Sequence, residues 1–302
     1  MYKKMLVLLD GSELAEVVFR YARELSGRLD LDLDLLHVVT PQEEDQLPMR
    51  RAYIERMAKL LCDEAQKLSA STSPAGVEKC IEAKGVVAIG DPADEIIKYI
   101  DENSVDLVML STRGKSGSKV WNIGSVATKV THASKVPVWL VPAELRDEIL
   151  EDSLPNRPLL VPLNGSEVAE AAIPYVVSVA RQRAEAAGEM ILVHVAEHPT
   201  TFYNADHLKA AEADRERIKA YLEGVAEPLR AQGFSVRTEV LIGDPATAVL
   251  QHIRYNPPQL VAMATRGRRG LSRFVFGSVT EEIMHSLKKT PMLLIPAVKE
   301  ED

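Results

Sequence analysis

Short uninterrupted runs of apolar residues alternate along the first half of the chain with longer segments whose apolar positions recur every three or four residues. The uninterrupted runs are typical of parallel strands covered on both faces, and they predict strands at residues 5–9, 33–39, 105–110 and 137–141, with another before Gly90. The spaced positions predict helices between Ser12 and Gly27 and at residues 51–68, 92–100 and 125–133. Strands that alternate with helices predict a doubly wound α/β domain with a parallel sheet.

Particular residues mark where the predicted helices begin and end. Ser12 is expected to be the N-cap of the first helix, and Gly27 is expected to stop it. Asp91 precedes Pro92, a pair typical of a helix start, because aspartate caps the free N–H groups and proline fits the first turn. In the second half of the chain, Pro174 falls inside the first helix and should kink or restart it.

The second half of the chain repeats the landmarks of the first half in the same order. The matching segments are 9–13 with 163–167, 35–39 with 192–196, 89–93 with 242–246, 112–114 with 265–267 and 124–126 with 277–279. A repeat this long is a duplicated domain and not a solenoid unit. The 302 residues therefore predict two domains, at residues 1–143 and 158–302, joined by an acidic, proline-containing linker at residues 144–157.

Within each domain, the strand order is left open by this pattern. Rossmann-like and flavodoxin-like orders both fit, and both place ligands beyond the carboxyl ends of the strands, where the strand order reverses. The residues that follow the strands are therefore the first place to look for chemistry.

Composition and charge exclude several classes of protein. The net charge of −8 argues against broad binding of a nucleic-acid backbone, which needs a basic face. The first apolar run ends at Asp10, too early for a signal peptide, and no stretch approaches the length of a membrane span. The two cysteines, Cys62 and Cys80, make neither a disulfide framework nor a zinc site. We therefore expect a cytoplasmic protein with reduced thiols, and neither nucleic acid nor membrane as a partner.

Two loops that follow predicted strands carry residue types suited to binding phosphate. Asp10 begins the turn after the first strand, and residues 111–125 follow the fourth strand. Glycine lets backbone N–H groups approach an anion, and Gly124 with Ser125 opens a helix whose free N–H groups favour negative charge. An ionised Asp10 accepts hydrogen bonds only, which suits a ribose hydroxyl or a magnesium ion held by phosphates. Arg113 adds positive charge.

These motifs resemble those of the universal stress protein family, whose signature is Gly-x2-Gly-x9-Gly-Ser/Thr after the fourth strand and Asp-Gly-Ser after the first. The resemblance covers both halves of the chain. It implies a five-stranded Rossmann-like sheet, similar to the adenine nucleotide alpha hydrolase fold, that binds ATP at its switch point and commonly dimerises through its last strand. In this chain the first signature glycine is replaced by Ser111 in one half and by Ala264 in the other, and Asn164 replaces the aspartate.

The resemblance also implies a role for each matching residue. Asp10 would meet the ribose and a magnesium ion, Val38 would offer its backbone to adenine, and the residues of the glycine loop would surround the phosphates. The implied binding residues of the first half are Asp10, Val38, Ser111, Gly114, Gly124, Ser125 and Val126. Those of the second half are Asn164, Val195, Ala264, Gly267, Gly277, Ser278 and Val279.

Other conspicuous residues have structural explanations that we favour. His37 and His194 occupy equivalent strand positions beside valines, where a histidine is usually structural. Asp91 and Asp244 each precede a proline, so that helix capping explains them better than metal binding. Three aromatic residues of the glycine loops are expected to anchor those loops to the core, namely Trp121, Phe274 and Phe276.

The resemblance implies a stress-response regulator that binds ATP with magnesium. Familiar catalytic motifs are absent from the sequence, so we do not expect a dedicated enzyme. The two halves are expected to pair through the edge strands that end at Val141 and Ile295, as a pseudo-dimer within the chain or in a homodimer. A protein partner is expected but not identified. Two alternatives stay open, a slow ATPase or phosphotransferase that uses Asp10 and magnesium, and an interaction module that binds no nucleotide.

Overall fold

The computed structural model describes residues 2–72, 80–114, 123–144, 158–181, 189–196, 205–265 and 277–296. The strands of the first half are β1 (Lys4–Leu9), β2 (Asp32–Val39), β3 (Ala83–Ile89), β4 (Leu107–Ser111) and β5 (Val138–Val141). Those of the second half are β6 (Leu159–Pro162), β7 (Met190–Ala196), β8 (Val236–Ile242), β9 (Leu260–Thr265) and β10 (Met292–Pro296).

The helices alternate with these strands, as the hydrophobic pattern predicts. In the first half they are α1 (Glu13–Glu16), α2 (Val18–Leu29), the short 3-10 helix η1 (Pro41–Gln46), α3 (Leu47–Thr72), α4 (Pro92–Glu102) and α5 (Ser125–Ala133). In the second half they are α6 (Glu167–Glu170), α7 (Ile173–Ala180), α8 (Ala205–Ala231), α9 (Pro245–Tyr255) and α10 (Ser278–Ser286). Of the helices described, none is long and apolar enough to cross a membrane.

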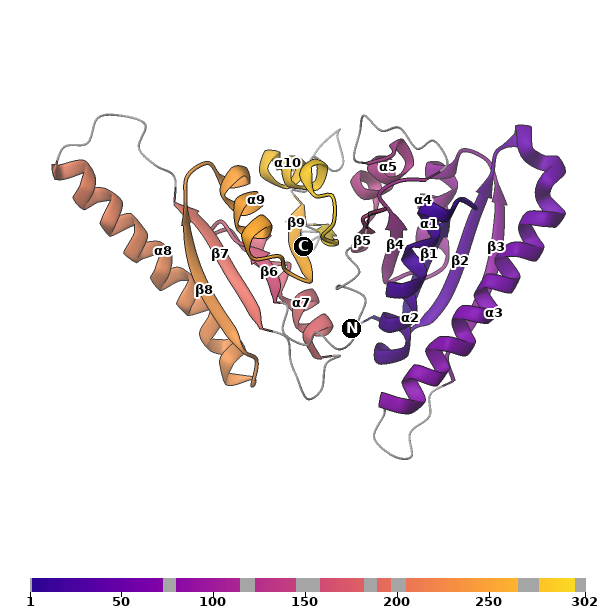
Figure 1. Cartoon of the computed structure of the whole chain (residues 1–302), viewed down its shortest axis with the longest axis horizontal. Coiled ribbons are helices and arrows are strands. Elements are labelled where there is room, and N and C mark those ends of the chain that lie inside the picture. Colours follow the sequence, from indigo (N-terminus) through magenta and orange to yellow (C-terminus); the bar gives the residue numbers. More distant parts are fainter. Residues whose placement is uncertain are drawn as a thin grey trace.

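Within the described residues, both halves contribute to one ten-stranded sheet with the order β3-β2-β1-β4-β5-β10-β9-β6-β7-β8 (Figure 1). Each half has five parallel strands in the Rossmann-like order, which decides between the two orders that fit the sequence. β5 and β10 pair antiparallel at the centre, with Trp139 opposite Leu293. The predicted pairing of the two last strands is thus confirmed within one chain, and it leaves neither of these edges exposed.

The uninterrupted apolar strands are explained by helices on both faces of the sheet. α2, α3, α7 and α8 cover one face, whereas α4, α5, α9 and α10 cover the other (Figure 1). Along β1, Met5 and Val7 belong to the buried cluster of the first face, and Leu6 and Leu8 belong to that of the second face. Each cluster contains residues of both halves, so the core is continuous across the β5–β10 junction.

The predicted helix starts are confirmed by hydrogen bonds. The Ser12 hydroxyl accepts a hydrogen bond from the backbone N–H of Ala15 at 3.2 Å. Asp91 accepts from two backbone N–H groups at the start of α4, and Asp244 accepts from one at the start of α9. Pro174 lies in the first turn of α7, after the chain has left α6, so the helix restarts there as predicted.

The prediction that Gly27 stops the first helix is wrong. α2 continues to Leu29, and the left-handed residue Asp30 (φ 53°) ends it. Gly27 is needed for another reason, since a Cβ atom built on it would lie 2.8 Å from both the Ala65 carbonyl oxygen and the Leu68 Cβ. This glycine therefore lets α2 approach α3 closely.

This close approach predicts that Gly27→Ala destabilises the protein. Alanine favours a helix interior by about 1 kcal/mol over glycine, but forcing a methyl group into a packed contact costs roughly 1–3 kcal/mol. We expect a net loss of about 1 kcal/mol in the free energy of unfolding, measured by urea denaturation. Gly224→Ala in α8 is the matched control, because a Cβ there meets nothing within 4 Å, and it should be neutral or stabilising. Equal gains in both variants would contradict the packing role of Gly27.

Candidate functional site

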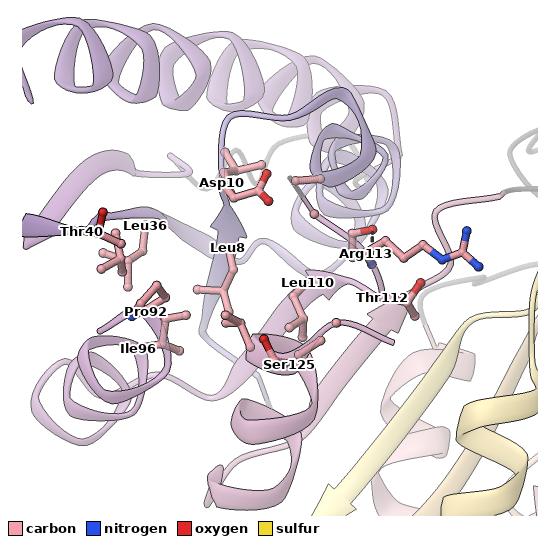
Figure 2. A pocket seen from close by; sticks show the side chains of 18 of the residues that line it. Leu8, Asp10, Leu36, Thr40, Pro92, Ile96, Leu110, Thr112, Arg113 and Ser125 are labelled. Carbon is pink, nitrogen blue, oxygen red and sulfur yellow. Dashed lines mark hydrogen bonds between the residues drawn. The ribbon is translucent and has the colours of Figure 1, made fainter. Parts of the chain in front are cut away.

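A cavity of about 300 Å³ lies at the carboxyl ends of β1 and β4 in the first half of the chain (Figure 2). These two strands are neighbours, but the chain continues from β1 to β2 on one side and from β4 to β5 on the other. The cavity therefore occupies the switch point, where α/β sheets of this type bind ligands. It is lined by all seven residues of the first half that the sequence singled out, namely Asp10, Val38, Ser111, Gly114, Gly124, Ser125 and Val126.

One end of the cavity is apolar. Figure 2 shows Leu36 of β2 close to Pro92 and Ile96 of α4, with Thr40 beside them at the end of β2. Val38 also lines this region. Such a surface suits a flat, weakly polar group, as the apolar walls of small-molecule pockets usually do.

The other end of the cavity presents backbone donors. Gly124 is the N-cap of α5 and makes no side-chain cap hydrogen bond, so the first turn of α5 keeps N–H groups available. Ser125 and Val126 follow in that turn and line the cavity. The position of Gly124 is fixed by its own N–H, which donates to the Thr112 carbonyl oxygen at 2.8 Å. A helix N-terminus of this kind favours an anion.

Asp10 lies between the two ends, in a tight turn. Its Oδ1 atom accepts hydrogen bonds from the Ser12 backbone N–H at 3.0 Å and from the Ser12 hydroxyl at 2.6 Å. Gly11, at φ +77°, supplies the left-handed conformation that this turn requires. Gly114 packs so closely that a Cβ atom built on it would lie 1.9 Å from Asp10 Oδ2. The two predicted loops therefore meet in space.

The second half repeats much of this arrangement. Asn164 Oδ1 accepts from the Ser166 N–H at 3.1 Å and from its hydroxyl at 2.6 Å, so the turn survives the loss of charge. Gly277 caps α10 without a side-chain bond, and Ser278 and Val279 begin that helix. Val195 lies in β7 and Ala264 in β9. Gly267 is outside the described residues, as are Trp121, Phe274 and Phe276.

The two strand histidines differ in their contacts. His37 is buried, and its Nδ1 atom lies 2.9 Å from the Leu9 carbonyl oxygen, which joins the ends of β2 and β1. This contact supports the predicted structural role. His194 packs edge-on against Tyr221, with 5.9 Å between the ring centroids, and burial lowers the pKa of its imidazole.

A metal ion at this cavity would depend on ligands from the bound molecule. In the part of the chain that the structure describes, no three side chains of histidine, cysteine, aspartate or glutamate are grouped to hold a metal. Magnesium commonly binds through one or two carboxylates together with phosphate oxygens and water. Asp10 fits this donor set as a single carboxylate beside a phosphate-sized space.

Sequence reasoning did not find the polar residues at the apolar end. Thr40 and Glu43 both line the cavity, and the Thr40 hydroxyl donates to a Glu43 carboxylate oxygen at 3.3 Å. Their location after β2 was the available signal, because β2 ends at the same edge of the sheet as β1 and β4. Pro92, which the sequence predicts as a helix start, also forms part of the cavity wall.

The fold and the cavity define a tandem, doubly wound α/β protein with a ligand-sized site at a switch point. The sequence model of the Universal stress protein family matches residues 1–142 and 155–296. The chain therefore belongs to the universal stress protein family, as its motifs predict.

Individual relatives agree with this assignment. A universal stress protein of Mycobacterium tuberculosis strain H37Rv is 23% identical over 295 residues, which covers 94% of each chain. Universal stress protein YxiE of Bacillus subtilis is 30% identical over 147 residues, covering 47% of this chain and 99% of that protein. Among solved structures, a universal stress protein from Archaeoglobus fulgidus shares the fold over 98% of both chains, with a TM-score of 0.62 and 23% identity.

Proposed function

We propose that this universal stress protein is a stress-response regulator whose first half binds ATP together with magnesium. The observation that carries this proposal is the convergence of the seven predicted residues on one cavity, with an apolar end, a carboxylate in the middle and free backbone donors at the far end. The parts of ATP follow the same order, with an apolar base, a ribose that carries hydroxyl groups and a negatively charged triphosphate.

Each part of the cavity has a task in this proposal. The adenine ring lies at the apolar end against Leu36, Pro92 and Ile96, with the backbone of Val38 at its edge. The ribose hydroxyls donate to the Asp10 carboxylate. The phosphates accept hydrogen bonds from the N–H groups at the start of α5, whose dipole favours their charge. Magnesium, when bound, would neutralise phosphate charge, with Asp10 as the protein carboxylate nearby.

The second half offers a related site without the carboxylate. Asn164 keeps the hydrogen bonds of the turn but carries no charge. We therefore propose that any nucleotide in this half binds with little dependence on magnesium. Residues 144–157 would serve as the linker between the two sites.

Asp10→Asn tests the role of the carboxylate directly. Because Asn164 makes the same two bonds to its serine as Asp10 does, the variant should keep the turn and lose only the charge. We expect magnesium to strengthen ATP binding to the first site in the natural protein and this strengthening to fall by about tenfold, or about 1.4 kcal/mol, in the variant. Isothermal titration with ATP, in magnesium and in EDTA, measures both quantities.

Asn164→Asp is the reciprocal variant and serves as the control. It should add a magnesium-dependent component to binding at the second site without altering the first. If Asp10→Asn leaves the magnesium dependence unchanged, Asp10 is not the metal-linked carboxylate.

A nucleotide that co-purifies with the protein would distinguish this proposal from the alternative, an interaction module that binds no nucleotide. Native mass spectrometry of gently purified protein should reveal an adenine nucleotide on the chain. A regulatory role then follows from the differential affinity of the nucleotide for two states of the chain, since only that difference shifts a conformational equilibrium.

A further inference from the structure

Arg113 lies at the phosphate end of the cavity and also contacts the end of the first half. It follows β4, lines the cavity, and its side chain extends away from the apolar end (Figure 2). Its Nη1 atom is 3.7 Å from Oε1 of Glu144, which lies beyond β5. The Arg113 side chain is 23% exposed, compared with 59% for Glu144. Arg113 thus lines the cavity, while its guanidinium group points away from the cavity and contacts the first residue of the predicted linker (Figure 2).

Thr112, next to Arg113, makes hydrogen bonds both to the start of α5 and to the end of β5 and the residues after it. Its carbonyl oxygen accepts from the Gly124 N–H at 2.8 Å, next to the donors at the start of α5. Its own N–H donates to the Val141 carbonyl oxygen at 2.8 Å, and its hydroxyl accepts from the Ala143 N–H at 3.3 Å. The phosphate end of the cavity and the chain that leaves β5 are therefore held to the same residue.

The ion pair between Arg113 and Glu144 is weak enough to exchange. A pair at 3.7 Å with a mostly exposed carboxylate contributes little, because solvent screens it and the side chains lose freedom. A triphosphate carries more charge, and a guanidinium group matches phosphate oxygens in two parallel hydrogen bonds. A phosphate in the cavity should therefore replace Glu144 as the partner of the Arg113 guanidinium group.

We propose that Arg113 binds the phosphates of the nucleotide and that Glu144 competes with them for its guanidinium group. This inference rests on the proposed function of the cavity. Binding in the first half then releases Glu144, so that occupancy of the site is transmitted to the chain segment that leads into the second half. Because coupling of this kind is reciprocal, a change that removes Glu144 from Arg113 also strengthens nucleotide binding.

A double-mutant cycle on the whole chain tests the exchange. The dissociation constants of ATP and of adenosine are measured by isothermal titration for the natural protein, Arg113→Gln, Glu144→Gln and the double variant. We expect Arg113→Gln to weaken ATP binding about tenfold, as loss of a charged hydrogen bond to phosphate does. Glu144→Gln should strengthen ATP binding about two- to fivefold, the range of an exposed ion pair. Adenosine, which has no phosphate, should bind all four proteins equally.

The double variant separates competition from general electrostatics. If Glu144 acts through Arg113, its replacement has no further effect once Arg113 is glutamine. Asp94→Asn is the charge control, because this variant removes one negative charge from an exposed position on α4, outside the residues that line the cavity, and it should change ATP affinity less than Glu144→Gln does.

Each outcome decides one claim. An equal effect of Glu144→Gln in both backgrounds, or an effect on adenosine, overturns the exchange while leaving nucleotide binding intact. Failure of the natural protein to bind ATP overturns the proposed function itself.

Discussion

Replacing Gly114 with valine is expected to weaken ATP binding to the first half by at least about a hundredfold, or roughly 2.7 kcal/mol. A Cβ atom at this position would lie 1.9 Å from Asp10 Oδ2, so either the carboxylate or the loop must move. The added methyl groups would also enter the space that we assign to the ribose and phosphates. Isothermal titration of ATP in magnesium measures the loss, and the companion variant Gly267→Val addresses the second half.

Gly224→Val provides the matched control for this substitution. A Cβ at Gly224 meets nothing within 4 Å, and the residue is exposed on α8, far along the sequence from the cavity residues. This variant should bind ATP like the natural protein. An unchanged isotherm for Gly114→Val would mean that the nucleotide does not occupy the space beside Asp10.

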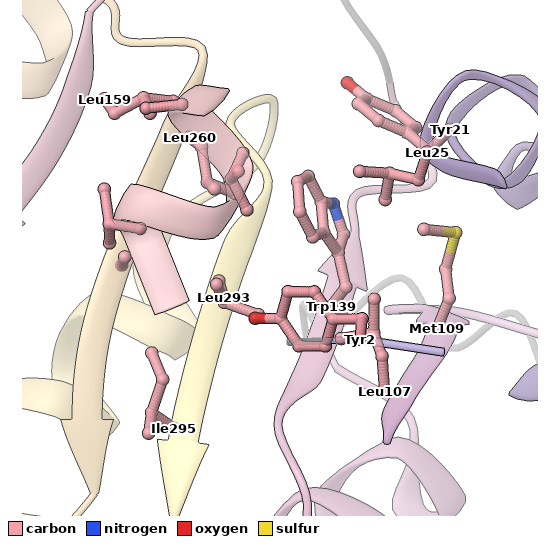
Figure 3. Packing of buried hydrophobic residues seen from close by; sticks show 14 of the residues in the cluster. Tyr2, Tyr21, Leu25, Leu107, Met109, Trp139, Leu159, Leu260, Leu293 and Ile295 are labelled. Carbon is pink, nitrogen blue, oxygen red and sulfur yellow. The ribbon is translucent and has the colours of Figure 1, made fainter. Parts of the chain in front are cut away.

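Replacing Trp139 with alanine is expected to lower the free energy of unfolding by about 3–5 kcal/mol. Trp139 is only 5% exposed, and it lies in β5 opposite Leu293 of β10, at the junction of the two halves. Figure 3 shows the indole between Leu293 and Tyr21 of α2, whose ring centroid is 6.2 Å away. Loss of the indole therefore leaves a cavity in a core that both halves share. Urea denaturation followed by circular dichroism measures the change.

Tyr255→Ala is the control, because it removes a large aromatic ring that is 77% exposed on α9. Its effect should stay within about 0.5 kcal/mol, as is usual for surface positions. A loss below about 1.5 kcal/mol for Trp139→Ala would show that the junction contributes little to stability.

The fold was largely predictable because helices on both faces bury the strands completely. Residues such as Met5 and Leu6, which face opposite sides of the sheet, both had to be apolar, and this produced the runs that predict strands. The strand order was not predictable, since it depends on packing between elements far apart in the sequence. The prediction that Gly27 ends a helix is wrong for the same reason. This glycine allows a close contact with α3, which the local sequence does not reveal.

The candidate site was predictable where a residue type has few alternative explanations. Asp10 and Gly124 have counterparts in the second half, Asn164 and Gly277. The structure places Asp10 and Gly124 in the wall of one cavity. Glu43 and Ile96 were missed because a carboxylate after a strand and an apolar helix residue have many ordinary roles. Only the packing of η1 and of α4 against β2 gives them a place in the cavity wall.

The most direct test of the account is a crystal structure of the whole chain grown with ATP and magnesium. We predict triphosphate density in the first half within hydrogen-bonding distance of the backbone N–H groups of Ser125 and Val126, with the adenine ring against Ile96. A cavity that stays empty at saturating ATP, or a nucleotide bound only elsewhere, would contradict the claim that backbone donors at this switch point hold the phosphates.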